Sequence, residues 1–148
     1  MTGDRPAAKA LAVDLGSRRV GLAVCDRDGS MAFPYAVIER ATEESLDAEA
    51  IARALAETGA TTVVVGLPLS LDGTEGPAAR GARQWAARLA EELEDTEVVL
   101  FDERLTTVSA QSALHAAGRR GRKARATIDS AAATVLLQSW LDAGRPTR

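Results

Sequence analysis

Residues 10–29, ALAVDLGSRRVGLAVCDRDG, decide the fold, because they place two strand-like runs on either side of one short turn. The runs are 10–13 and 20–25, and the first of them stops at Asp14. The DRDG segment that closes the stretch is itself a turn signal. These residues therefore predict a hairpin with a carboxylate where its first strand ends.

The rest of the chain extends this hairpin into a sheet. A third strand-like run at 32–38 contains Pro34, which indicates an edge position or a bulge, and the three runs together predict an antiparallel meander. Helical and strand periods then alternate, which is typical of parallel strands joined by helices. In chain order we expect helix 44–57, strand 61–65 (buried on both faces), helix 77–93, strand 98–101, and helices 107–117 and 127–141 separated by a basic linker at 118–126. The sequence thus predicts an α/β fold with a five-stranded mixed sheet flanked by helices, in the order β-β-β-α-β-α-β-α-α.

The 148 residues suit one domain, which we expect to span 9–142, between a flexible N-terminal tail at 1–8 and a C-terminal tail at 143–148. Aromatic residues make up only 3%, so the core must consist mainly of aliphatic residues and alanine. Cys25 is the only cysteine, which excludes an intramolecular disulfide, and no apolar run is long enough to cross a membrane. We therefore expect a cytoplasmic protein.

Positive charge is concentrated in one segment of an otherwise acidic chain. The net charge is −3, yet five basic residues occur with no acid among them: Arg119, Arg120, Arg122, Lys123 and Arg125. Such a cluster can bind a polyanion through its phosphates, with little sequence specificity. A charge run that only faces solvent remains the alternative.

Three carboxylates occur where one edge of the predicted sheet can gather them. Asp14 ends the first strand, Asp102-Glu103-Arg104 follows the last one, and Asp129 falls in the first turn of the last predicted helix. Each alone has an ordinary structural explanation, such as a turn residue or a helix cap. Together they would repel one another unless a cation neutralised them, and oxygen ligands suit Mg²⁺ or Mn²⁺. The pattern predicts a metal site that acts on a phosphodiester.

Four segments in this order resemble the YqgF family of Holliday-junction-resolvase-like proteins, also described as pre-16S rRNA nucleases. They are AVDLGSRRVGLAV at 12–24, VVVGLPLSLDGTEGP at 63–77, DERLTT at 102–107 and IDSAAATVLLQ at 128–138. The resemblance implies a ribonuclease-H-like fold and metal-dependent nuclease activity in which Asp14, Glu103 and Asp129 are the catalytic residues and metal ligands. It also implies a role in maturing the end of small-subunit ribosomal RNA.

Further residues are candidates for contact with nucleic acid. Ser70 and Thr74 belong to the turn-rich loop that leaves the buried fourth strand, and Arg18 lies in the hairpin turn. Arg104 can stabilise phosphate charge as a bidentate donor, or it can pair with Asp102 and hold the strand end. We expect these four residues and the basic cluster to bind the substrate.

Three functions remain open at this stage. A nuclease that processes precursor ribosomal RNA, with the ribosomal subunit as a candidate partner, and a resolvase that cuts branched DNA would use the same site. A resolvase is expected to work as a two-fold dimer. Monomer and homodimer are therefore both open. A non-catalytic RNA-binding ribosome-assembly factor is the third. An actin-like ATP-binding protein also uses an Asp-x-Gly-Ser turn, but it needs two such domains, which 148 residues cannot supply.

Overall fold

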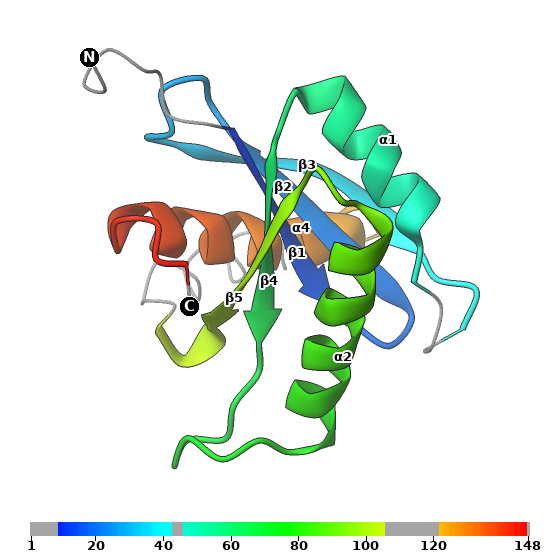
Figure 1. Ribbon diagram of the computed structural model, residues 1–148, viewed down its shortest axis with the longest axis vertical. Coiled ribbons are helices and arrows are strands. Elements are labelled where there is room, and N and C mark those ends of the chain that lie inside the picture. Colours follow the sequence, from blue (N-terminus) through cyan, green and yellow to red (C-terminus); the bar gives the residue numbers. More distant parts are fainter. Residues whose placement is uncertain (1–8, 43–45, 106–121, 148) are drawn as a thin grey trace.

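The computed structural model describes residues 9–42, 46–105 and 122–147. Its centre is a five-stranded sheet in the order β3-β2-β1-β4-β5 (Figure 1). The strands are β1 (Ala10–Leu15), β2 (Arg19–Cys25), β3 (Ala32–Glu39), β4 (Thr62–Leu67) and β5 (Glu97–Asp102). The first three form an antiparallel meander, whereas β4 runs parallel to both β1 and β5. The predicted mixed sheet is confirmed.

Helices cover both faces of the sheet. Helices α1 (Ala48–Thr58) and α2 (Pro77–Glu92) lie on one face, and α4 (Arg122–Asp142) crosses the other (Figure 1). A short 3₁₀ turn, Glu103–Leu105, follows β5 directly. The element order agrees with the prediction as far as β5, while the helix expected at 107–117 lies outside the described residues.

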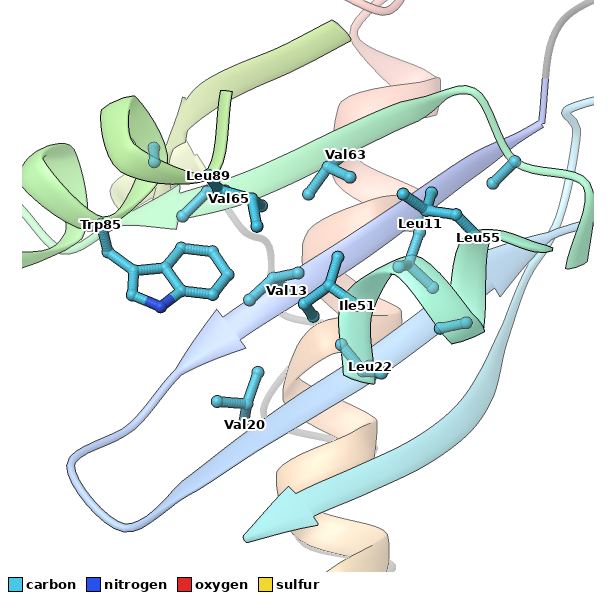
Figure 2. Close-up of a cluster of buried hydrophobic side chains, with 13 residues drawn as sticks. Leu11, Val13, Val20, Leu22, Ile51, Leu55, Val63, Val65, Trp85 and Leu89 are labelled. Atoms are coloured by element: carbon cyan, nitrogen blue, oxygen red, sulfur yellow. The ribbon is translucent and has the colours of Figure 1, made fainter. Parts of the chain in front are cut away.

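Alternation along β1 divides the apolar interior into two clusters. Leu11 and Val13 face α1 and α2, where they pack with Ile51, Trp85 and Leu89 (Figure 2). On the opposite face, residues of the strands pack against α4, and those of β1 and β2 are small. The members of this cluster are Ala10, Ala12, Ala23, Cys25, Val64, Val99, Phe101, Ala133, Leu136, Leu137 and Trp140. Because alanines dominate the contact with β1 and β2, α4 can approach the sheet closely.

Strand β3 has the irregularity that its proline predicted. It forms an edge of the sheet, and its pairing with β2 shifts register between Leu22 and Ala23, where Pro34 pairs with Ala23. An edge strand tolerates proline because the missing N–H would face outward. Strand β4, by contrast, is buried along its whole length, as its β-branched sequence predicted.

Two helix starts differ from the sequence predictions. Helix α1 begins at Ala48 rather than Glu44, because Asp47 takes a left-handed conformation (φ 57°) that a helix cannot include. Helix α4 begins at Arg122 rather than at Thr127, so the proposed linker at 118–126 is wrong for its second half. After Gly121 the sequence RKARA contains only good helix formers, and the anchored part of α4 extends backwards through it.

The residues after α4 turn back onto it. The Trp140 indole nitrogen donates to the carbonyl oxygen of Pro146 at 2.7 Å, and the Arg145 guanidinium lies 5.1 Å from the centre of the Trp140 ring. Both tryptophans, Trp85 and Trp140, are buried. Within the described ranges, every helix is too short or too polar to span a bilayer.

Candidate active site

Asp14 lies at the end of β1, on the face of the sheet that α4 covers. Its placement follows from the period of two along the strand, since Ala10 and Ala12 face α4 in the same way. The antiparallel register sets Asp14 opposite Gly21, which has no side chain to cover it. Asp14 is half-buried, so its carboxylate lies at the rim of the core rather than inside it.

Glu103 comes to the same place from the other side of β4. It is the first residue of the 3₁₀ turn after β5 and leans over Gly66 in β4. A Cβ atom at position 66 would stand 2.6 Å from Glu103 Oε1, which is closer than real Cβ contacts. Glycine at 66 therefore leaves the space that the Glu103 carboxyl group occupies.

The two carboxyl groups are in direct contact, and this changes their protonation. Burial, followed by the negative charge of Asp14, a hydrogen bond with Asp14 and the charge of Asp102, raises the pKa of Glu103 to about 7. Two like charges brought together in a partly dry site favour a shared proton. The pair can release that proton when a cation supplies the missing positive charge.

Asp102, the neighbour of Glu103, points elsewhere and forms an ion pair. The Arg104 side chain donates to both of its carboxylate oxygens, with Nη2 2.6 Å from Oδ2 and Nε 3.1 Å from Oδ1. Hydrogen bonds from this side chain hold the pKa of Asp102 below its usual value. Adjacent acids thus have opposite environments, and only Glu103 meets Asp14.

Arg104 also contacts the loop between β4 and α2. Its Nη1 donates to the carbonyl oxygen of Leu71 at 3.3 Å, and it lies against Gly73, whose φ of 89° turns the chain there. The guanidinium group that we considered for substrate contact is therefore engaged by Asp102 and by this loop. It remains partly exposed at its outer side.

The two hydroxyl residues predicted to contact substrate are exposed in the same loop. The backbone N–H of Ser70 donates to the carbonyl oxygen of Thr74 at 3.0 Å, which closes a tight turn. The Thr74 hydroxyl donates to Asp72 Oδ1 at 2.7 Å. Ser70 and Thr74 thus lie at the tip of a loop whose base is next to Glu103, and their contact with substrate remains a prediction.

Asp129 lies well inside α4 rather than in its first turn, because the helix starts at Arg122. Its side chain is outside the described part of the structure. The next residue, Ser130, is buried and donates its hydroxyl to the carbonyl oxygen of Leu22 at 3.1 Å. Leu22 pairs with Val13, one residue before Asp14, so the helix backbone at 129–130 lies level with the end of β1.

The basic candidates fall into two groups. Arg18 is exposed in the β1–β2 turn, where its carbonyl oxygen accepts a hydrogen bond from the backbone N–H of Arg40 at 2.9 Å. Arg119 and Arg120 lie outside the described residues. Arg122, Lys123 and Arg125 are in the first turns of α4, but their side chains are not described.

Carboxylate oxygens that face each other at the rim of the core are suitable ligands for Mg²⁺ or Mn²⁺. Within the described ranges, no three acidic, histidine or cysteine side chains come close enough to form a complete metal site. Asp14 and Glu103 would therefore be two of the ligands. Asp129 is the candidate for the third ligand, because its backbone in α4 lies level with the end of β1.

Sequence reasoning missed two features near this site. It did not predict that Glu103 fills the space above Gly66. It gave no role to Arg40, whose Nη1 donates to the carbonyl oxygen of Gly16 at 2.7 Å and so holds the turn that follows Asp14. Both contacts join residues far apart in the chain, and no local pattern signals them.

Comparison with known proteins shows which family the chain belongs to. The family model described as "RuvX: Holliday junction resolvase" matches residues 8–143. A relative from Kineococcus radiotolerans is 49% identical over 141 residues, which cover 95% of this chain and 74% of the relative. One from Anaeromyxobacter sp. (strain K) is 46% identical and covers 93% of this chain and 99% of its own length. Both are named "Putative pre-16S rRNA nuclease".

Among solved structures, the chain is similar to Thermus thermophilus RuvC in complex with a Holliday junction substrate. The TM-score is 0.60 at 14% identity, over 95% of this chain and 99% of the other. A second T. thermophilus RuvC structure matches with a TM-score of 0.52 at 13% identity, over 93% and 97% of the two chains. At such low identity the likeness concerns the fold, and it confirms the predicted ribonuclease-H-like architecture.

Proposed function

The chain belongs to the RuvX family, which is described as a Holliday junction resolvase family, and we propose that it is a metal-dependent nuclease that hydrolyses phosphodiesters in precursor 16S ribosomal RNA. Membership of this family supports nuclease activity, and the names of the relatives favour the RNA substrate. We further propose that the protein acts in the cytoplasm, where both precursor ribosomal RNA and the ribosomal subunit occur.

The contact between Asp14 and Glu103 is the observation that carries this proposal. Burial and mutual repulsion make this pair unfavourable in its ionised form, as the raised pKa of Glu103 reflects. A protein keeps such a pair at a functional site more often than at a structural one. A bound divalent cation would stabilise the ionised pair and would supply a Lewis acid and an activated water for attack at phosphorus.

The residues of the chain itself have distinct tasks in this proposal. Asp14 and Glu103 provide ligand oxygens from two strand ends, and Asp129 provides the third from α4. Gly66 leaves room for Glu103, and the Asp102–Arg104 pair fixes the turn that carries it. No described side chain beside the pair is a separate general base, so proton removal falls to the ligand carboxylates or to solvent.

Resolution of branched DNA is the second candidate function. It is favoured by the description of the family model and by the fold shared with a RuvC structure that contains a Holliday junction. A resolvase that cuts two strands symmetrically is expected to be a two-fold dimer. The mass of the protein in solution, with and without a four-way junction, therefore separates this candidate from a monomeric RNA nuclease.

The test is cleavage by the purified protein of a precursor 16S rRNA fragment and of a four-way DNA junction, with Mg²⁺ or Mn²⁺. Asp14→Asn is the inactive variant, and Asp28→Asn, which changes an exposed turn residue, is its matched control. We expect RNA to be cut by wild type and Asp28→Asn, and cutting to be lost in Asp14→Asn or with EDTA. Cutting of the junction alone would replace the RNA proposal with the resolvase, and binding of RNA without any cutting would favour an assembly factor.

A further inference from the structure

A hollow of about 500 Å³ lies between the β1–β2 turn and α2. Leu15, Gly16 and Ser17 form one wall, and Trp85 and Arg88 of α2 form part of the other. Leu15 packs on the α1–α2 side of the sheet, whereas Asp14 faces α4. The hollow therefore adjoins the proposed active site but opens on the opposite face of the same sheet edge.

Trp85 contributes an indole N–H that has no hydrogen-bond partner in the described part of the chain. The side chain is only 3% exposed, so water does not simply replace the missing acceptor. Figure 2 shows its nitrogen on the edge of the ring that faces away from Leu89. A buried donor left unsatisfied destabilises the fold, and a ligand with an acceptor oxygen would remove that cost.

The charge around this donor is positive. Arg40 and Arg88 both line the hollow, and none of its described lining residues is acidic. Arg40 is held in place, since its Nη1 donates to Gly16 and its Nε lies 3.4 Å from Asp47 Oδ2. Arg88 is exposed at the opening and can reach a ligand there.

A second hollow, of about 430 Å³, continues the first around the turn and shares Ser17 and Arg40 with it. Arg18 and Arg19 line it, together with Glu39. The Arg40 side chain is only 4% exposed and pairs with Asp47, whereas Arg18, Arg19 and Arg88 are exposed along this edge. A charged nucleic-acid backbone would meet them in succession as it passes this edge of the sheet.

We propose that the hollow beside Trp85 binds a backbone phosphate of the nucleic-acid strand, as a second contact on the face opposite the carboxylates. This inference rests on the proposed function, because it needs a nucleic-acid strand bound at Asp14. The Arg88 guanidinium and the Trp85 N–H donate to the phosphate oxygens. Inorganic phosphate and a mononucleotide carry the same phosphate group, and the experiment below distinguishes both of them from a nucleic-acid strand.

The experiment follows Trp85 fluorescence in a Trp140→Phe protein, which leaves one indole in the chain. The probes are inorganic phosphate, AMP and a short single-stranded RNA, in EDTA so that nothing is cut. Arg88→Gln is the test variant, and Arg53→Gln, on the exposed side of α1, is its matched control. Anisotropy of labelled RNA on the otherwise wild-type chain repeats the comparison without the Trp140 substitution.

We expect RNA to change Trp85 emission, and Arg88→Gln to weaken both this response and RNA binding. We also expect that variant to lower the slope of log K against log[salt] by about 0.7, the value for one phosphate contact on a single strand. A response to phosphate or AMP but not to RNA would overturn the assignment to a nucleic-acid backbone. Equal RNA binding by Arg88→Gln and Arg53→Gln would overturn the site itself.

The two proposals can fail separately. If RNA and DNA substrates remain uncut while Trp85 still responds to RNA, the nuclease proposal fails and the phosphate site stands. If cutting is normal while Trp85 does not respond and Arg88→Gln binds RNA like Arg53→Gln, the phosphate site fails alone. Asp14→Asn protein is expected to retain the Trp85 response, because Asp14 faces the other side of the sheet.

Discussion

The Glu103 carboxyl group occupies the space that a side chain at Gly66 would need: Oε1 lies 2.6 Å from the position of a Cβ atom there. Strand β4 thus takes part in the proposed metal site through the absence of a side chain. The two residues are far apart in the sequence, and each is ordinary when considered alone. Their pairing makes the proposed site sensitive to a single methyl group.

We therefore expect Gly66→Ala to reduce cleavage at least tenfold while the protein stays folded. The added methyl must displace Glu103 and separate it from Asp14, and a misplacement of about 1 Å can cost about a hundredfold in rate. Kinetics with the cleavable substrate, together with circular dichroism, measures the effect. Gly76→Ala is the control, because a Cβ atom there meets nothing within 4 Å; equal loss in both variants would contradict the prediction.

The protonation of Glu103 predicts how stability depends on pH without metal. Its pKa is about 7 in the folded protein against an ordinary value of 4.5, so the folded state binds the proton more tightly. The stabilisation from this proton is complete below pH 4.5 and is lost as pH rises to 7 and beyond, by at most about 3 kcal/mol.

Glu103→Gln should remove this part of the pH dependence and raise the free energy of unfolding at pH 8. Urea denaturation in EDTA at several pH values measures it. Glu91→Gln, an exposed change on α2, should leave the curve unchanged. If Glu103→Gln instead lowers stability equally at pH 5 and pH 8, the buried carboxyl pair does not behave as described.

Metal binding should reverse the same destabilisation. We expect millimolar Mn²⁺ or Mg²⁺ to raise the melting temperature at pH 8, because a ligand that binds only the folded state stabilises it by mass action. Asp14→Asn should lose this shift, and Asp28→Asn should keep it. Thermal unfolding with a metal titration gives the result without any nuclease substrate, and a full shift in Asp14→Asn would place the ion elsewhere.

Arg104 should act on the loop between β4 and α2. Arg104→Ala removes the hydrogen bonds to Asp102 and to the carbonyl oxygen of Leu71, so we expect faster proteolysis within 68–76 and a higher KM. Arg53→Ala on α1 is the matched control. If the loop is cut at the wild-type rate, the guanidinium group does not hold it in place.

The sequence predicted where the sheet edge gathers its acids, for a definite physical reason. Parallel strands end at one edge, so residues that follow β1 and β5 must be close, and Asp14 and Glu103 are in contact. Their role as metal ligands stays a prediction, as does that of Asp129. Short runs of apolar and β-branched residues were enough to predict all five strands.

The features that the sequence did not predict depend on tertiary contacts. The start of α1 is set by the backbone of Asp47, and the start of α4 by its anchoring on β2 through residues such as Ser130. Local propensity does not mark the first point, and the good helix formers after Gly121 extend α4 only because the helix is anchored further along. In the same way, Trp85 is buried, and only the fold reveals that its N–H lacks an acceptor among the described residues.

The alanine contact between α4 and the sheet has a consequence for recognising active relatives by sequence. Two chains can share Asp14, Glu103 and Asp129 and still differ in chemistry if one has leucine at Ala12 or Ala133, since the larger side chain would push the helix and its acid outward. A search pattern made only of the acids would accept both chains. The sizes of these buried neighbours belong in the signature as much as the charges do.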